Sequence, residues 1–365
     1  MSNPNTSINS TEPTSIATND TCATQPGAVH IPIIFMTIGV LSNCVALGIL
    51  VKTYKRFRQK WRASFLLFAS GLVFTDCLGH VITGAITIRV YALEKDWARI
   101  DSSGHLCPFL GTSMVFFGLS ALFLGSVMAI ERCLGITQPL LHSAKMTAQC
   151  AKFILSGTWL FALCIALLPN LGLGKYTVQC TQSWCFLKTS NITFVTERGI
   201  LLLFSSLGLT ALGISLLCNM ISGVALLRAR VRSKPHRQGK SHHVEMLVQL
   251  MTIMCVSCIC WGPFLVIVAR IGSLNAGRPV ITSLLFSVRL ATWNQILDPW
   301  VYILLRKSVL RRIWKLTHLC MGKPDIRLHS WNCSSLQSTI KTAAMERSIS
   351  TAKRQSQIAR INESQ

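Results

Sequence analysis

Charged residues are scarce in this sequence, and acidic side chains are the scarcest of them. Only 13% of the 365 residues are charged, with 13 Asp and Glu against 36 Lys and Arg, while half of the chain is hydrophobic. A water-soluble core cannot bury that much apolar surface, so the composition excludes an ordinary soluble globular protein. It predicts a protein whose main solvent is lipid.

The apolar residues gather in seven segments, each close to the ~20 residues that a helix needs to cross a bilayer. Backbone groups must be hydrogen-bonded within lipid, and segments of this length exclude the strands of a barrel. We therefore predict an all-α membrane protein, a seven-transmembrane helix bundle. The predicted spans are residues 31–51, 63–89, 108–130, 151–169, 199–227, 246–270 and 280–305.

Lys and Arg are absent from residues 1–30, whereas residues 52–62 and 228–240 contain six each and the chain after residue 305 contains twelve. Cytoplasmic flanks of membrane spans carry this excess. We predict a glycosylated extracellular N-terminus over 1–30, a bundle over 31–305 in the plasma membrane, and a cytoplasmic C-terminus. The net charge of +23 then reflects basic flanks near anionic lipid, so no nucleic-acid partner is needed.

The C-terminal region divides into two parts. The stretch ILLRKSVLRRIWKL (303–316) alternates apolar and basic residues at helical spacing, which predicts a short amphipathic eighth helix on the membrane surface over 306–320. Residues 321–365 contain many Ser and Thr among basic residues, which predicts a disordered cytoplasmic tail. Phosphorylation of this tail and an arrestin partner are a further hypothesis. Cys320 is either palmitoylated or an ordinary thiol.

Two kinds of site are predicted on the outer side. Only four of the fifteen cysteines, Cys22, Cys107, Cys180 and Cys185, are expected there, and the others are interpreted as small packing residues. The cluster CVSCIC (255–260) lacks a second ligand pair, so no metal site is predicted. Asn-x-Ser/Thr acceptors for glycosylation occur at Asn5, Asn9, Asn19 and Asn191.

Motifs for catalysis and for a bound cofactor are missing. The sequence has no H-E-x-x-H and no G-x-S-x-G, and residues 280–305 contain no lysine that could hold retinal. A transporter would favour broken helices or internal repeats, so a transporter of an apolar acid stays a remote alternative. These absences favour a receptor, with no enzymatic activity, cofactor or metal expected.

Four polar residues inside the predicted spans need a reason, namely Asp76, His80, Arg289 and Asp298. An ionised side chain at the centre of a membrane helix costs about 2.5–3.5 kcal/mol on insertion scales. Arg289 either pairs with a carboxylate of the bundle or faces an outward-opening cavity and binds an acid. We favour the second interpretation, because both aspartates lie deeper. A planar guanidinium suits a carboxylate, and the apolar surroundings suit a long apolar acid.

Several motifs, in this order, resemble those of the rhodopsin-like G-protein-coupled receptors. They are GVLSN (39–43), LVFTD (72–76), Glu131-Arg132-Cys133, Cys260-Trp261-Gly262-Pro263 and Asp298-Pro299-Trp300-Val301-Tyr302. More narrowly, GLGKYTVQCTQSWCF (172–186) and RLATWNQILDPWVY (289–302) resemble the prostanoid receptors, in particular their F-type branch. An E-type or thromboxane receptor is the alternative within that group.

The resemblance implies a prostaglandin, a twenty-carbon acid, as ligand. Arg289 would bind its carboxylate, with added hydrogen bonds from Tyr91 and Ser183. His80 and, more weakly, Thr292 would face the ring hydroxyls. The apolar chains of the ligand would contact Met114, Phe186, Trp261, Phe264 and Val288.

The resemblance also implies a disulfide between Cys107 and Cys185, and Cys22 could pair with Cys180. A heterotrimeric G protein, by resemblance of the Gq class, would be the partner, leading to phospholipase C and calcium release. Residues implied in coupling and activation are Glu131, Arg132, Asp76, Pro263, Asp298, Pro299 and Tyr302.

Two details of the predicted activation apparatus follow from single residues. Pro263 removes a hydrogen bond from the sixth span, so this span is a candidate hinge. Ala121 stands where the wider family often has a serine near its sodium site, which argues against sodium binding by Asp76 and Asp298.

Overall fold

The computed structural model describes residues 29–57, 63–232, 237–273 and 278–304. Three of the predicted glycosylation acceptors (Asn5, Asn9 and Asn19), the eighth helix over 306–320 and the tail over 321–365 lie outside the described residues. They stay predictions.

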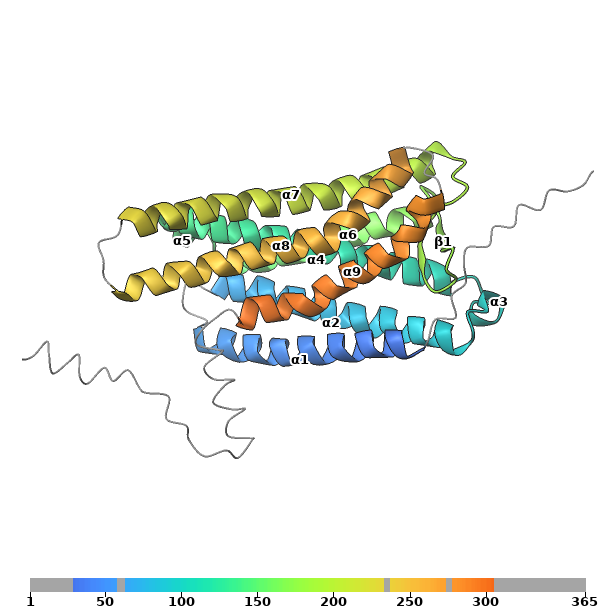
Figure 1. Cartoon of the computed structure of the whole chain (residues 1–365), viewed down its shortest axis with the longest axis horizontal. Helices are drawn as coiled ribbons and strands as arrows, with labels where there is room; N and C mark the ends of the chain where they lie inside the picture. Colours follow the sequence, from blue (N-terminus) through green and yellow to red (C-terminus); the bar gives the residue numbers. More distant parts are fainter. Residues whose placement is uncertain (1–28, 58–62, 233–236, 274–277, 305–365) are drawn as a thin grey trace, which may run out of the picture. The chain divides into compact units, whose positions relative to one another are not determined.

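Seven long helices form a bundle (Figure 1). Six of these described helices are long and apolar enough to cross a membrane, and the seventh, α9, contains Arg289 and Asp298. The predicted seven-helix bundle is therefore confirmed. The helices are α1 (His30–Phe57), α2 (Ala63–Ala92), α4 (Leu106–Thr137), α6 (Ala148–Leu167), α7 (Val195–Arg232), α8 (Arg237–Ser273) and α9 (Arg278–Leu304).

Several helices continue beyond the predicted spans. We predicted spans at 199–227 and 246–270, whereas α7 extends to Arg232 and α8 begins at Arg237. Hydropathy marks the part of a helix that lies in lipid. It does not mark the helix end, because Arg and Lys are good helix formers and their charged ends reach water.

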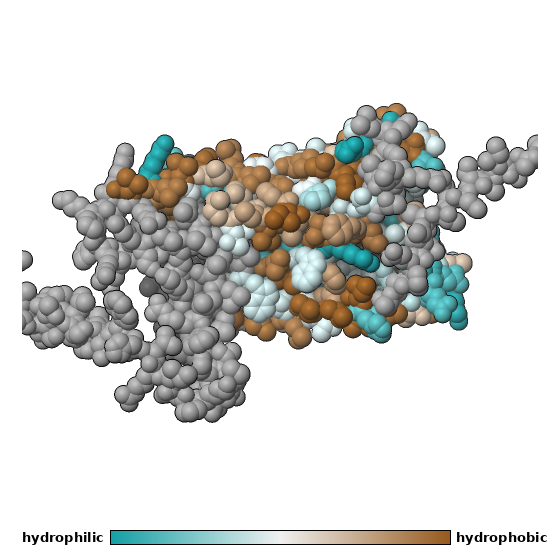
Figure 2. Space-filling model, viewed as in Figure 1, coloured by the Kyte–Doolittle hydropathy of each residue, from teal (hydrophilic) through white to brown (hydrophobic). Residues whose placement is uncertain are grey.

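The outer face of the bundle is apolar. Apolar side chains cover most of the visible surface over the helices (Figure 2), and Phe153, Leu217 and Ile259 are each exposed by more than half. Such a surface suits contact with lipid chains. The inside is packed around α4, which contacts α2, α6 and α7 and buries Leu119 and Leu124 completely.

Short elements close the two ends of the bundle, and the sequence did not predict them. At one end lie α3 (Trp97–Ile100), the 3-10 helix η1 (Leu168–Leu171) and a hairpin of β1 (Tyr176–Val178) and β2 (Cys185–Leu187). The hairpin is antiparallel, with Tyr176 opposite Leu187 and Val178 opposite Cys185. The short helix α5 (Pro139–Lys145) lies at the other end (Figure 1).

Candidate ligand-binding site

The β1–β2 hairpin is covalently attached to the bundle. A disulfide joins Cys107 in the first turn of α4 to Cys185 in β2, with the two Cα atoms 5.5 Å apart. This confirms the pairing that the resemblance implied. Cys180 is also disulfide-bonded, but its predicted partner Cys22 lies outside the described residues. The disulfide to α4 makes the hairpin a fixed lid over one end of the helices.

Asp101 holds the start of α4 in place beside this disulfide. Its two carboxylate oxygens accept hydrogen bonds from the backbone N–H groups of Leu106 and Cys107, both at 2.9 Å. Partial burial alone would raise the pKa of Asp101, but the backbone donors outweigh it and lower the pKa below its usual value of 3.8. The ionised carboxylate therefore caps the helix that carries the lid.

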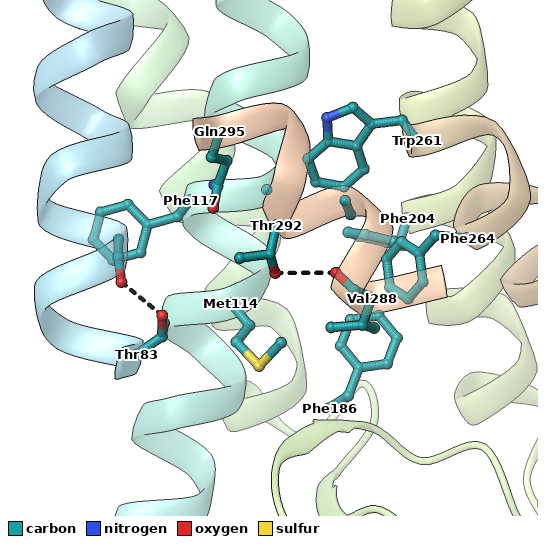
Figure 3. A pocket seen from close by; sticks show the side chains of 13 residues that line it. Thr83, Met114, Phe117, Phe186, Phe204, Trp261, Phe264, Val288, Thr292 and Gln295 are labelled. Carbon is teal, nitrogen blue, oxygen red and sulfur yellow. Dashed lines mark hydrogen bonds between the residues drawn. The ribbon is translucent and has the colours of Figure 1, made fainter. Parts of the chain in front are cut away.

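Buried hydrogen bonds fix the shape of the lid. The Gln179 side chain donates to the backbone carbonyls of Phe186 and Leu187 at 3.3 and 3.2 Å, and its oxygen accepts from the Thr189 hydroxyl at 2.6 Å. The Tyr176 hydroxyl donates to the Ala166 carbonyl at 2.7 Å. These bonds hold the backbone of Phe186, so its ring points from the lid into the bundle (Figure 3).

A cavity of about 70 Å³ lies beneath Phe186, between the lid and Trp261. Figure 3 shows Phe186 at one end, rising from the loop, with Trp261 and Gln295 at the other. Its walls come from α2, α4, α7, α8 and α9 as well as from the lid. They are made by Gly79, Thr83, Met114, Phe117, Gly118, Phe186, Phe204, Trp261, Phe264, Val288, Ala291, Thr292 and Gln295.

An aromatic cluster forms one wall. The ring of Phe186 lies 5.4 Å from those of Phe204 and Phe264, which are 5.9 Å from each other, all between ring centroids. Trp261 continues the series, 6.3 Å from Phe264. Their edge-on and tilted arrangements are favourable. The lid is thus in packing contact with the segment of α8 that surrounds Pro263.

Three polar side chains line the opposite wall. The hydroxyls of Thr83 and Thr292 donate to the carbonyls of Gly79 and Val288 at 2.6 and 3.0 Å (Figure 3). Each hydroxyl oxygen keeps the capacity to accept a hydrogen bond, and the Gln295 amide can both donate and accept. The arrangement can therefore hold a mainly apolar ligand and orient its few polar groups.

Six of the ten predicted ligand contacts line this cavity, namely Met114, Phe186, Trp261, Phe264, Val288 and Thr292. Sequence reasoning missed Thr83, Phe117, Phe204, Ala291 and Gln295. A signal existed for α9, because positions 288, 291, 292 and 295 recur at helical spacing and so share one face.

The other four predicted contacts do not line the cavity. Arg289 is half-buried on α9 beside Val288, about 4.5 Å of helix rise from Thr292. No hydrogen bond or ion pair joins its guanidinium to any residue that the structure describes. Tyr91 lies under the Lys95 ammonium, whose nitrogen is 5.0 Å from the ring centroid.

Ser183 and His80 are buried away from the cavity. The Ser183 hydroxyl lies 3.0 Å from that of Thr181, within the lid. His80 packs on Gly39 so closely that a Cβ atom there would lie 2.5 Å from the imidazole ring. Its Nε2 is buried and has no hydrogen-bond partner in the described part of the chain. A direct contact of either residue with a ligand in this cavity would require it to move.

Comparison with known proteins decides the family. Residues 42–302 match the 7 transmembrane receptor family (rhodopsin family). The chain is 55% identical over 336 residues to the human prostaglandin F2-alpha receptor, covering 91% of this chain and 93% of that receptor. The chain belongs to the prostaglandin receptors of the rhodopsin family.

More distant relatives agree with this assignment. The dog prostaglandin E2 receptor EP1 subtype is 39% identical, with 85% of this prostaglandin receptor and 88% of the relative covered. The crystal structure of squid rhodopsin superposes with a TM-score of 0.64 at 18% identity, covering 82% of this chain and 89% of rhodopsin. That likeness shows the fold. The chain is accordingly a multi-pass membrane receptor and not an enzyme.

At the α5 end of this prostaglandin receptor, Glu131 and His142 form a buried contact. The His142 Nε2 lies 3.1 Å from a carboxylate oxygen of Glu131. The neighbouring Arg132 places its guanidinium over the Phe65 ring, with 4.3 Å to the centroid. Contact between Glu131 and α5 was not predicted.

Two buried carboxylates lie between this end and the cavity. Asp298 accepts a hydrogen bond from the Asn294 amide at 2.8 Å. Both oxygens of Asp76 and the hydroxyl of Ser120 are buried without a hydrogen-bond partner among the described residues. Pro263 and Pro299 lie inside α8 and α9, as predicted. The side chain of Tyr302 lies outside the described residues.

Proposed function

We propose that this chain is a receptor for prostaglandin F2-alpha that signals through a Gq-type G protein to phospholipase C and calcium release. The observation that carries the proposal is the cavity beneath the lid, with apolar aromatic walls, a polar side and an arginine on its flank. Identity to F2-alpha receptors exceeds that to an E2 receptor by 16 percentage points, 55% against 39%, which favours the F type.

The expected pose follows from the chemistry of the ligand. A twenty-carbon acid has one charge, and Arg289 has no described partner, so the carboxylate would bind there with support from Tyr91 and Ser183. The ring hydroxyls would meet hydrogen-bonding groups on the wall opposite the aromatic cluster, such as Thr292 and Gln295. The aliphatic chains would contact the aromatic cluster.

Binding would require the cavity to widen. Its volume of about 70 Å³ is well below the ~300–1,000 Å³ of pockets that hold drug-sized ligands. Phe186, Phe264 and Trp261 form the wall that would have to move, and the last two flank Pro263. A ligand that prefers the widened state a hundredfold would shift the equilibrium by about 2.7 kcal/mol. We propose that this bends α8 and opens a cleft near Arg132 for the G protein.

The carboxylate pairing is tested by a cycle of two changes. Radiolabelled prostaglandin F2-alpha is displaced by the unlabelled acid or by its primary alcohol, in which CH₂OH replaces the carboxylate. Truncating one partner of a buried charge pair costs about 2–5 kcal/mol, so the alcohol should bind the native receptor about 30-fold or more weakly. Arg289→Ala should weaken the acid by a similar factor and make acid and alcohol equal.

A matched control is Arg270→Ala, because Arg270 is an exposed arginine near the end of α8. It should leave both affinities unchanged. If Arg289→Ala weakens acid and alcohol by the same factor, Arg289 does not bind the carboxylate and the proposed pose is wrong.

Ligand type and coupling are tested in cells by calcium release. Prostaglandins of the F, E and D types and a thromboxane mimic are titrated on cells that express the receptor. The titration is repeated in cells from which the α subunits of the Gq class have been deleted. Prostaglandin F2-alpha should act at the lowest concentration, and deletion of the Gq class should abolish its response. A lower effective concentration for an E-type ligand would make the chain an E-type receptor. Binding without calcium release would refute the coupling alone.

We also propose that the lid faces the cell exterior, with the N-terminus extracellular and the C-terminus cytoplasmic. The disulfide between Cys107 and Cys185 supports this orientation, because disulfides form and persist in oxidising compartments. Asn191 is exposed between β2 and α7 near the same end, where a glycan would fit. Removal of N-glycans should reduce the apparent mass of both proteins, and the reduction should be larger for the native chain than for the Asn191→Gln variant. Equal reductions would show that Asn191 is unmodified.

A further inference from the structure

A pair of thiols lies between α1 and α2, away from the ligand cavity. The sulfur atoms of Cys44 and Cys77 are 3.6 Å apart, although the residues are 33 positions apart in the sequence. Both cysteines are free, Cys44 is exposed and Cys77 is half-buried. Two thiols in van der Waals contact across two tightly packed helices need only a small side-chain rotation to bond, since a disulfide brings the sulfurs to about 2.05 Å.

The thiol pair is open to the lipid side of the bundle. Cys44 lines a hollow on α1 together with Leu47, Gly48, Val51 and Lys52. A Cβ atom added at Gly48 would meet no atom within 4 Å, so the hollow is open at this residue in the described chain. Apart from Lys52 this lining is apolar, so it admits an apolar reagent from the acyl chains more readily than a charged, water-soluble one.

We propose that Cys44 and Cys77 form an oxidisable dithiol that an apolar hydroperoxide, such as a fatty-acyl hydroperoxide, closes into a disulfide. The Cys44 sulfur attacks the terminal oxygen of the hydroperoxide, the O–O bond breaks, and Cys44 becomes a sulfenic acid. The thiol proton goes to the leaving alkoxide, which departs as an alcohol. Cys77 sulfur then attacks the sulfenic acid; the S–S bond forms, the S–O bond breaks, and water leaves. Two thiols lose two electrons, and the peroxide bond gains them.

The disulfide would connect α1 to α2 beside a polar centre of the bundle. Cys44 follows Asn43, whose amide donates to carbonyls of Gly39 at 2.9 Å and of Gln295 in α9 at 3.2 Å. Cys77 follows Asp76, whose carboxylate is buried. The oxidised form would therefore hold α1 against α2 next to Asn43, which hydrogen-bonds α1 to α9.

The test uses the full-length receptor in phospholipid bilayers treated with cumene hydroperoxide. Remaining thiols are alkylated, the protein is digested, and peptides are identified by mass spectrometry with and without prior reduction. We expect a peptide in which Cys44 is linked to Cys77, loss of most of the alkylation at both positions, and recovery of both on reduction. Hydrogen peroxide at the same concentration should produce less of the linked peptide.

Variants distinguish this site from general oxidation. Cys77→Ser should abolish the linked peptide, and Cys44 should then stop at the sulfenic acid or its further oxidation products. Cys164→Ser is the matched control, because Cys164 is also exposed; it should leave the Cys44–Cys77 link unchanged. Elution of each variant as a single species in detergent shows that it is folded.

Two outcomes would overturn the proposal. One is oxidation of Cys44 to sulfinic or sulfonic acid in the native receptor without a linked peptide. The other is a link confined to a different pair, such as Cys133 and Cys218, whose thiols also interact.

Discussion

The contact between Glu131 and His142 leads to a prediction about stability. Only 6% of the Glu131 side chain and 4% of the His142 side chain are exposed, and their nearest polar atoms are 3.1 Å apart. His142→Ala would leave the Glu131 carboxylate buried without this partner. Breaking a buried ion pair by removing one partner costs about 3–5 kcal/mol. Leaving one buried polar group without its hydrogen bond costs about 1–3 kcal/mol.

We therefore expect His142→Ala to lower the stability of the purified receptor by about 3 kcal/mol. For a chain of 365 residues, that corresponds to a fall of about 4 °C in the apparent Tm. The assay is thermal unfolding in detergent at one heating rate, because unfolding of a membrane protein is commonly irreversible and the midpoint then depends on that rate. Ser143→Ala is the matched control, since Ser143 is exposed and its hydroxyl donates to the nearby Leu140 carbonyl.

A double-mutant cycle tests whether the contact itself is responsible. Glu131→Ala and His142→Ala should each lower the Tm, and the double variant should lower it by less than the sum of the two. An interaction of about 1 kcal/mol or more is expected for residues in contact. If the two effects add within about 0.5 kcal/mol, or if His142→Ala behaves like Ser143→Ala, the contact does not stabilise the receptor and the reasoning is refuted.

Three further predictions concern the lid and the cavity. Gly111→Ala should lower the Tm, because the new Cβ would overlap the Tyr176 ring, and overpacking costs about 1–3 kcal/mol. Asp101→Asn should lower the Tm at pH 7, and the difference from the native receptor should disappear as the pH falls below 3.8, since the folded-state pKa is depressed and its contribution is lost on protonation. Gly118→Ala would place a Cβ 3.2 Å from the Trp261 ring and should weaken prostaglandin binding about tenfold; unchanged affinity would show that the ligand does not reach this depth.

The bundle could be predicted because it depends on local signals, and the lid disulfide because the resemblance implied it. Runs of apolar residues identify membrane spans whatever the packing, and the pairing of Cys107 with Cys185 came with the resemblance. The exact helix ends could not be predicted, since they lie in water, where α7 and α8 continue as ordinary helices. Three-residue strands such as β1 and β2 are too short to show a period.

Contacts between helices could not be predicted from the sequence. A membrane helix is apolar on all sides, so no polar stripe shows which face is buried. No pattern in the sequence therefore indicated that Glu131 contacts α5, that Cys44 meets Cys77, or that Phe204 lines the cavity. His80 illustrates the same limit, because its fit against Gly39 depends on the rotation of two helices.

The lid has a mechanical consequence for α8. Phe264 packs on Phe186, and the disulfide beside Phe186 ties the lid to α4, so the short part of α8 that follows Pro263 is anchored. The part of α8 on the other side of Pro263, from Arg237 to Gly262, has 26 residues and a length of about 39 Å. This part is longer than the anchored part that follows Pro263. A rotation of about 10° at Pro263 would therefore displace its far end by about 7 Å. If α8 bends at Pro263 as proposed, rearrangements smaller than one side chain at the cavity would be converted into a movement of about 7 Å at the opposite end of the helix.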